Sequence, residues 1–139
     1  MPNLLDTNIV SDLIRNPQGK VAQHIRRFGE AQVCTSIMVA AELRYEADKK
    51  GSPKLSSQLA LVLGALEILP LETPADAENG AVRTQLERAG TPIGANDLLI
   101  AAQALALGYT VVSDNDKEFS RIKDLRCENC LRRHAGVRL

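Results

Sequence analysis

Aromatic side chains and net charge are both scarce in this sequence. Tryptophan is absent, and the aromatic residues Phe28, Tyr45, Tyr109 and Phe119 make up 3% of the 139 residues. A platform of stacked aromatic rings for nucleic-acid bases is therefore not expected. Lys and Arg number 17, as do Asp and Glu, so the net charge at neutral pH is zero. Composition thus gives no support for a nucleic-acid partner, and any such contact must come from a local patch.

Long hydrophobic runs and paired cysteines are also missing. No apolar run approaches the roughly 18–20 residues that span a bilayer, and the N-terminus lacks the charged and apolar segments of a secretory signal. The three cysteines, Cys34, Cys127 and Cys130, are an odd number that fits a reducing compartment better than a disulfide scaffold. We therefore expect a cytoplasmic protein with no membrane segment.

The chain has the size and the pattern of one α/β domain covering residues 1–139. Short apolar runs alternate with longer amphipathic ones, which predicts a central, mostly parallel sheet of four to five strands with helices on both faces. The predicted strands are 2–5, 32–35, 68–71, 109–112 and 125–127. The predicted helices are 8–15, 17–28, 37–50, 55–66, 73–88, 98–107 and 119–122. Residues from about 131 onward, ending RRHAGVRL, are expected to form a loosely held basic tail.

A carboxylate directly follows the first predicted strand. Leu4 and Leu5 have the character of a buried strand, and Asp6 comes next. Burying an ionised carboxylate is costly unless it is paired, hydrogen-bonded or bound to a metal. In a doubly wound parallel sheet, ligands bind beyond the carboxyl ends of the strands, which is where Asp6 would lie. The acidic loop SDNDKE (113–118) follows the fourth predicted strand and should reach the same edge.

Two further acids come from helices. Asp97 follows Asn96, the expected cap of an apolar helix, and a carboxylate in this first turn is favoured by the helix dipole. Glu42 lies in the helix 37–50, beside the apolar face. Each acid alone has an ordinary explanation as a capping, solvated or loop residue. Their convergence on one sheet edge indicates a functional site more strongly than any single acid does.

A cluster of carboxylates has a definite chemical use. Such groups repel one another unless protons or cations neutralise them, and oxygen ligands select hard ions such as Mg²⁺ or Mn²⁺. An ion of this kind polarises a phosphoryl oxygen and activates water. No nucleophile–base pair competes for the role, because we expect His24 and His134 to be surface residues. These observations favour metal-dependent phosphodiester hydrolysis.

The sequence resembles the PIN-domain ribonucleases, specifically the VapC-type toxins of bacterial toxin–antitoxin pairs. The resemblance covers essentially the whole chain, in family order and spacing. It rests on the segments LLDTN (4–8), TSIMVAAELRYEA (35–47), AVRTQLERAG (81–90), TPIGANDLLIAAQALALG (91–108) and VVSDNDKEF (111–119). It implies a PIN-like fold, a homodimer, a cognate VapB-type antitoxin and an Mg²⁺- or Mn²⁺-dependent endoribonuclease activity. Some relatives cut initiator tRNA, which makes tRNA the first substrate to consider.

The resemblance also implies roles for particular residues. It assigns metal binding to Asp6, Glu42 and Asp97, with a fourth polar group in the loop after the fourth strand. The polar position of the family falls on Asn115, but the flanking acids leave the choice open. We favour Asp116 as the fourth ligand, with Asp114 as the alternative.

Three other positions are implied to act beside the metal ligands. Thr7 or Asn8 could orient Asp6 or a bound water. Arg83 stands at a position that is frequently basic in the family and could contact a substrate phosphate, although a solvated helix face would explain it equally well.

Two rival interpretations remain. A haloacid-dehalogenase-like phosphatase also ends its first strand on an aspartate, but it needs a second aspartate where this chain has Asn8. A small zinc-binding or redox interaction module could instead use Cys127 and Cys130, with His134 four residues further on. That module predicts stoichiometric zinc or loss of activity on Cys127→Ser. The nuclease predicts RNA cleavage that survives this change.

Overall fold

The computed structural model describes residues 2–131. The basic tail predicted from about residue 131 lies outside the described residues except for Leu131, as does His134. Within the described part, five strands form one parallel sheet in the order β3-β2-β1-β4-β5. The strands are β1 (Asn3–Leu5), β2 (Val33–Ser36), β3 (Glu67–Leu69), β4 (Thr110–Val112) and β5 (Cys127–Glu128). The predicted parallel α/β sheet is therefore confirmed.

Helices connect the strands, as the alternating pattern predicted. They are α1 (Thr7–Arg15), α2 (Lys20–Phe28), α3 (Ile37–Lys50), α4 (Pro53–Ala65), α5 (Ala75–Arg88), α6 (Ala95–Leu107) and α7 (Asp116–Phe119), with a 3₁₀ turn, η1 (Glu30–Gln32), before β2. The prediction that a helix begins at Pro17 was wrong, because the backbone N–H of Gly19 closes a turn on Asn16 O at 2.9 Å. The last short helix begins at Asp116 rather than at Phe119.

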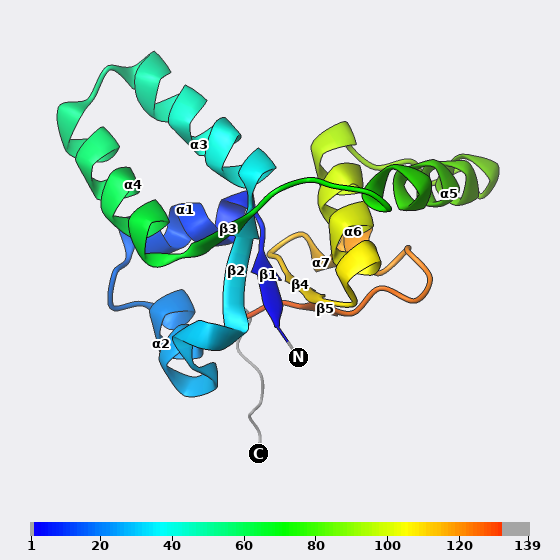
Figure 1. Ribbon diagram of the computed structural model, residues 1–139, viewed down its shortest axis with the longest axis horizontal. Helices are drawn as coiled ribbons and strands as arrows, with labels where there is room; N and C mark the ends of the chain where they lie inside the picture. The colour runs from blue at the N-terminus through cyan, green and yellow to red at the C-terminus, as the bar shows by residue number, and fades with distance from the viewer. Residues whose placement is uncertain (1, 132–139) are drawn as a thin grey trace.

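The strand order places the helices in two layers. From β1 the chain moves outward through β2 to β3, then crosses back to β4 and continues to β5. Because parallel crossovers are right-handed, this reversal puts α1 to α4 on one face of the sheet and α5 to α7 on the other (Figure 1). The point of reversal lies between β1 and β4, where such sheets open a crevice at their carboxyl ends.

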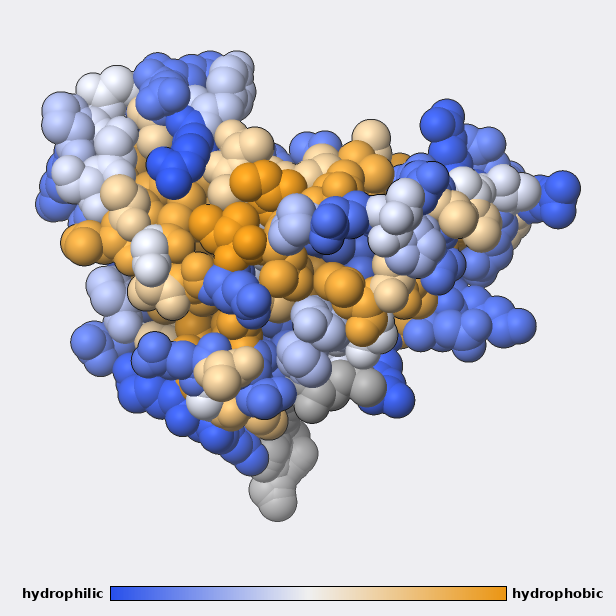
Figure 2. Space-filling view, in the orientation of Figure 1, coloured by the Kyte–Doolittle hydropathy of each residue, from blue (hydrophilic) through white to orange (hydrophobic). Residues whose placement is uncertain are grey.

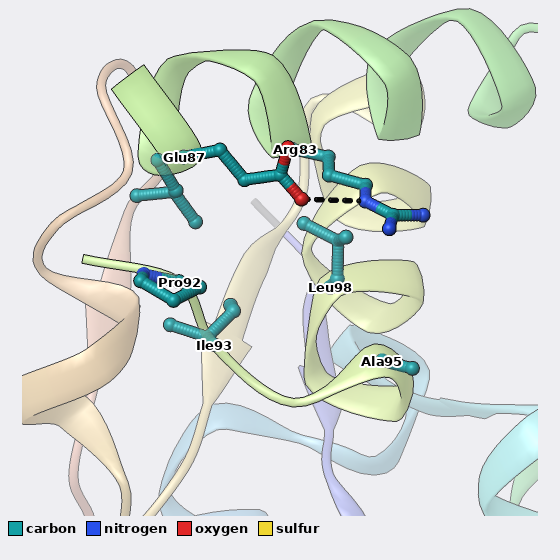
Figure 3. Close-up of a pocket in the computed structure, with 7 residues that line it drawn as sticks. Arg83, Glu87, Pro92, Ile93, Ala95 and Leu98 are labelled. Carbon is teal, nitrogen blue, oxygen red and sulfur yellow. Dashed lines mark hydrogen bonds and ion pairs between the residues drawn. The ribbon is translucent and has the colours of Figure 1, made fainter. Parts of the chain in front are cut away.

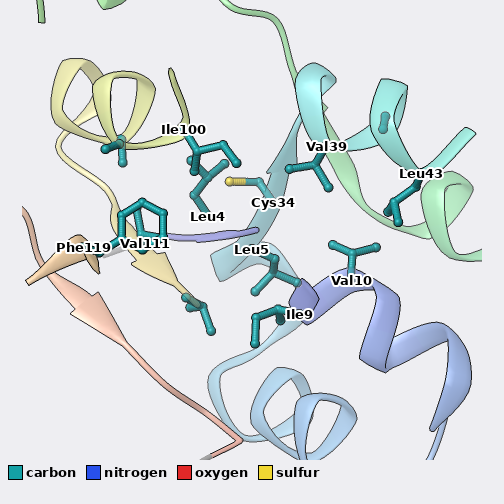
Figure 4. Packing of buried hydrophobic residues seen from close by; sticks show 14 of the residues in the cluster. Leu4, Leu5, Ile9, Val10, Cys34, Val39, Leu43, Ile100, Val111 and Phe119 are labelled. Atoms are coloured by element: carbon teal, nitrogen blue, oxygen red, sulfur yellow. The ribbon is translucent and has the colours of Figure 1, made fainter. Parts of the chain in front are cut away.

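The hydrophobic core lies along the central strands. Leu4, Leu5 and Val111 are fully buried, because β1 and β4 are covered on both faces, which favours consecutive apolar residues such as Leu4 and Leu5. Figure 4 shows the side chains that the helices pack onto these strands: Ile9 and Val10 from α1, Val39 and Leu43 from α3, Ile100 from α6 and Phe119 from α7. This packing fixes β1, α3 and α6, which position the predicted acids Asp6, Glu42 and Asp97.

One face of the molecule has a hydrophobic area. Figure 2 shows it over the centre of the view, where the chain runs from α4 through β3 toward α5. Over residues 2–131, the exposed large apolar side chains are Phe28, Ile37, Tyr45, Leu61, Leu71 and Leu107. Among the described helices, none combines the length and the apolar character that a membrane crossing requires.

Candidate active site

Asp6 is held by the sheet and by a helix at once. Its backbone N–H donates to Val112 O at 3.1 Å, which continues the pairing of β1 with β4. Its Oδ1 accepts the backbone N–H of Ile9 at 3.1 Å, so that Asp6 caps the N-terminus of α1. The side chain is buried, with 3% of the residue exposed. The carboxylate is therefore fixed at the carboxyl end of the central strand, where the sequence predicted it.

The environment of Asp6 disfavours its charge. Burial raises its pKa to about 6, and the nearby carboxylates of Asp97 and Asp114 act in the same direction. Hydrogen bonds from Ser113 and from the Ile9 N–H oppose the rise without cancelling it. A cation placed beside Asp6 would remove this cost, because it favours the ionised carboxylate.

Glu42 reaches the same place from α3. Its Oε1 accepts the hydroxyl of Thr7 at 3.2 Å and the side-chain amide of Asn96 at 3.3 Å. These two donors belong to the first turns of α1 and α6. Glu42 therefore ties together three segments that are far apart in the sequence.

Asp97 lies in the first turn of α6. Its Oδ2 accepts the side-chain amide of Asn115 at 3.1 Å. Burial raises its pKa, the charges of Glu118 and Glu42 raise it further, and the hydrogen bond from Asn115 lowers it. The charged forms of Asp6 and Asp97 are thus disfavoured for the same reason, because each carboxylate is partly desolvated and lies near other acids.

The expected helix cap at Asn96 was wrong. Gly94 occupies the cap position and α6 begins at Ala95, with no side-chain hydrogen bond to its first turn. Asn96 instead turns its amide toward Glu42. The shift does not move Asp97 out of the first turn.

These side chains line one cleft of about 400 Å³ at the carboxyl edge of the sheet. The cleft brings together six of the residues singled out in the sequence, which are Asp6, Thr7, Asn8, Glu42, Asp97 and Asn115. Gly94, Ala95 and Asn96 complete its lining. Segments separated by up to about a hundred residues therefore meet at the crevice that the strand order predicts.

Asp114 and Asp116 do not line this cleft. The side-chain amide of Asn129 donates to Asp114 Oδ1 at 3.2 Å and to Asp116 Oδ1 at 3.3 Å. Asp116 faces a separate pocket, which Cys127 and His24 also line. Arg83, the remaining predicted residue, lies on α5 outside the cleft, where its Nε is 3.0 Å from Glu87 Oε2.

The cleft suits a hard divalent cation, because oxygen atoms that could bind such an ion line it. Its charged groups are the carboxylates Asp6, Glu42 and Asp97, and Asn115 adds an amide oxygen, a set that matches Mg²⁺ or Mn²⁺. Over residues 2–131, no three Asp, Glu, His or Cys side chains are already grouped around a single ion position. Glu42 and Asp97 instead accept hydrogen bonds from neighbouring side chains.

Sequence reasoning missed Ser113 and underrated Asn96. Ser113 is fully buried, hydrogen-bonds to Asp6, and accepts the backbone N–H of Asn115 on its Oγ at 2.8 Å. Its position directly after β4 was an available signal, because it matches the position of Asp6 after β1. The contact of Asn96 with Glu42 depends on how α3 and α6 pack, which the sequence pattern does not reveal.

The cysteines give the zinc interpretation no site in the part of the chain that is described. Cys127 and Cys130 form no disulfide within the described residues, and they line one pocket with His24. His24 is half-buried and packs on the Phe28 ring, with centroids 4.6 Å apart. No group of three His, Cys, Asp or Glu residues suited to a metal forms here or elsewhere between residues 2 and 131.

Comparison with known proteins identifies the class to which this fold and cleft belong. The model of the PIN domain family matches residues 4–125. The tRNA(fMet)-specific endonuclease VapC of Salmonella typhimurium is 38% identical over 132 residues, covering 91% of this chain and 96% of the relative. Ribonuclease VapC2 of Rickettsia felis is 37% identical over 128 residues, with the same coverage. The chain belongs to the PIN domain family of nucleases, as a member of its VapC type.

A solved structure of a related protein supports the same family assignment. The crystal structure of VapBC2 from Rickettsia felis, bound to a DNA fragment from their promoter, superimposes with a TM-score of 0.86 at 35% identity. The match covers 93% of this chain and 98% of that one. The expected PIN-like fold is confirmed.

Proposed function

We propose that this protein is a toxin endoribonuclease that hydrolyses RNA phosphodiester bonds with the aid of Mg²⁺ or Mn²⁺ held by Asp6, Glu42 and Asp97. The observation that carries the proposal is the meeting of these three acids in one cleft at the point where the strand order reverses. These three acids come from the end of β1, from α3 and from α6, and burial desolvates two of them, Asp6 and Asp97. The raised pKa values of Asp6 and Asp97 are what a cation site without its cation produces.

Each acid has its own part in holding the ion. Asp6 is the most rigid, because the sheet and the cap of α1 both fix it. Glu42 and Asp97 would be the other two ligands, and hydrogen bonds from Thr7, Asn96 and Asn115 hold their carboxylates in the cleft. When bound, an ion of this class supplies positive charge to the phosphoryl oxygens and to the attacking water.

We assign the fourth polar position to Asn115. It lines the cleft and contacts Asp97, whereas Asp116 lines another pocket. Asp114 contributes through its charge, which acts on Asp6. Thr7 positions Glu42 rather than Asp6, and Asn8 lies in the cleft lining with its side chain exposed.

The relatives suggest a substrate and partners. The Salmonella relative is named a tRNA(fMet)-specific endonuclease, so tRNA is the substrate that we propose to test first. The Rickettsia structure is a VapBC complex, and we infer that a VapB-type antitoxin neutralises this protein in the cytoplasm. We further infer a homodimer, since exposed apolar side chains such as Leu61, 76% exposed, are typical of surfaces that bind other proteins.

The decisive experiment compares RNA ends after brief expression of the wild type and of Asp6→Asn, which keeps the shape of the side chain. We expect new 5′ ends at one or a few RNA positions with the wild type alone. Purified wild-type protein should cut the same RNA with Mg²⁺ or Mn²⁺ and stop with EDTA, and Asp97→Ala should also be inactive. Asp48→Asn, an exposed acid of α3 outside the cleft, is the matched control. A folded Asp6→Asn protein that still cuts RNA would contradict the mechanism.

A further inference from the structure

A second pocket adjoins the acidic cleft and is not used by the metal site. It has a volume of about 300 Å³ and lies between α5 and the start of α6. Its lining combines an apolar floor with one charged pair. The lining residues are Arg83, Leu86, Glu87, Pro92, Ile93, Ala95 and Leu98. In Figure 3 the side chains of Arg83 and Glu87 extend across the pocket, above Pro92, Ile93 and Leu98.

The pocket and the cleft share a wall. Ala95 lines both, while its neighbours divide between them, with Ile93 in the pocket and Gly94 in the cleft. In Figure 3, Ala95 lies at the same end of the pocket as the guanidinium of Arg83. A ligand whose phosphate lies in the cleft can therefore extend past Ala95 into the pocket.

The shared wall is also suited to a phosphate. No side chain caps α6, whose first turn begins at Ala95. The first N–H groups of a helix need acceptors and attract anions. A phosphodiester at this position would have the acids on one side of it and the Arg83 pocket on the other.

Arg83 is held loosely enough to change partner. Its Nε lies 3.0 Å from Glu87 Oε2, and the two side chains are 67% and 57% exposed. An ion pair so exposed contributes little to stability, so a ligand can displace it at small cost. Meanwhile the pair keeps the planar guanidinium extended beyond Leu98, on the side of the pocket where Ala95 lies.

We propose that this pocket binds one unstacked base of the RNA substrate, next to the phosphate that is cut, with the guanidinium of Arg83 stacked on the base. The proposal rests on the ribonuclease function proposed above. Aromatic side chains are absent from the pocket lining, and RNA-binding proteins use guanidinium planes as well as aromatic rings to stack splayed bases. A base can enter only when it is free of a duplex, so the preferred substrate is a single-stranded loop.

The test uses Arg83→Lys, which keeps the charge but removes the plane. Arg88→Gln, which removes an exposed cation further along α5 and outside the pocket, is the matched control. The probe is a synthetic stem–loop with the loop sequence of the site that the wild type cuts, beside versions with an abasic nucleotide on either side of the cut. The value of kcat/KM is measured for each protein and RNA.

The effects of Arg83→Lys and of the abasic nucleotide on kcat/KM should not add, because both remove the same contact. One abasic version should lower kcat/KM of the wild type by about tenfold, a typical loss for one stacking contact. Arg83→Lys should lose about the same on the intact RNA and nothing further on that abasic version, while Arg88→Gln behaves as the wild type. Full activity of Arg83→Lys would overturn the proposal, because charge alone would then suffice, and so would a wild type indifferent to both abasic positions. A wild type that cuts no RNA would overturn the ribonuclease function itself, and this inference with it.

Discussion

The side-chain amide of Asn115 donates a hydrogen bond of 3.1 Å to Oδ2 of Asp97. This contact joins the loop after β4 to the first turn of α6, and it places a neutral group where a fourth acid would add to the repulsion among Asp6, Glu42 and Asp97. The neutral amide therefore limits the electrostatic cost of the cleft while keeping an oxygen available to a cation.

Changing Asn115 to Asp should make the protein depend on a divalent ion for its stability. The new carboxylate would replace a donor to Asp97 with a like charge, so we expect the metal-free protein to lose roughly 1–3 kcal/mol of unfolding free energy. Added Mn²⁺ should restore more stability to this variant than to the wild type. Urea unfolding with EDTA or Mn²⁺ measures both effects. Asn115→Ala removes the hydrogen bond without adding charge, and equal stabilities of the two variants would contradict the prediction.

Thr7→Val should weaken metal binding without unfolding the protein. The hydroxyl of Thr7 donates to Glu42 Oε1, and valine keeps the shape but not the donor. Groups that orient metal ligands typically change affinity or activity by about 10- to 100-fold. A Mn²⁺ titration of cleavage rate should therefore shift to higher concentration, and Thr7→Ser should recover most of the loss. An unchanged titration for Thr7→Val would show that Glu42 needs no such support.

The stability of the metal-free protein should fall as the pH rises through 6. The pKa of Asp6 is about 6 in the fold against 3.8 ordinarily, so the folded state binds this proton more tightly than the unfolded state. The protonated Asp6 therefore contributes to the free energy of unfolding. This contribution is fully present below about pH 4 and is lost as the pH passes 6, by up to about 3 kcal/mol. Unfolding in EDTA across this range measures the loss.

Two controls separate this effect from other titrations. Asp6→Asn should reduce the slope of stability between pH 4 and 6, because the titrating group is gone. Saturating Mn²⁺ should stabilise the wild type more at high pH than at low pH, since the ion competes with the proton. A slope that is unchanged in Asp6→Asn would assign the pH dependence to other groups.

Cys127→Ser should leave RNA cleavage intact. The thiol lines the pocket of His24 and Asp116, away from the acidic cleft. The purified wild type should contain no stoichiometric zinc, as elemental analysis can establish. Zinc at one atom per chain, or a loss of activity in Cys127→Ser, would instead favour the zinc or redox module.

Local patterns were sufficient to predict most of the fold. Leu4 and Leu5 form a buried strand because both faces of β1 are covered, and Ser36 caps α3 through its side chain, as its chemistry predicts. Since Asp6 directly follows β1, its place at the sheet edge was determined by the chain itself.

The errors arose where tertiary contacts decide. Asn96 was expected to cap its helix, but Glu42 of a distant helix offers its amide a charged acceptor. Spacing alone also left the choice between Asn115 and Asp116 open, because the hydrogen bond of Asp116 with Asn129 involves a residue from beyond β5. The pocket of Arg83 could not be foreseen either, since it exists only where α5 crosses the start of α6.

The strand order also has a consequence for synthesis of the protein. Asp6 and Glu42 lie before β3, whereas Asp97 and Asn115 come after it, and β4 inserts beside β1 only once most of the chain exists. A nascent chain still lacking β4 has neither Asn115 of the cleft lining nor the backbone acceptor for Asp6. The cleft is therefore completed only when translation has passed β4 and the loop that carries Asn115.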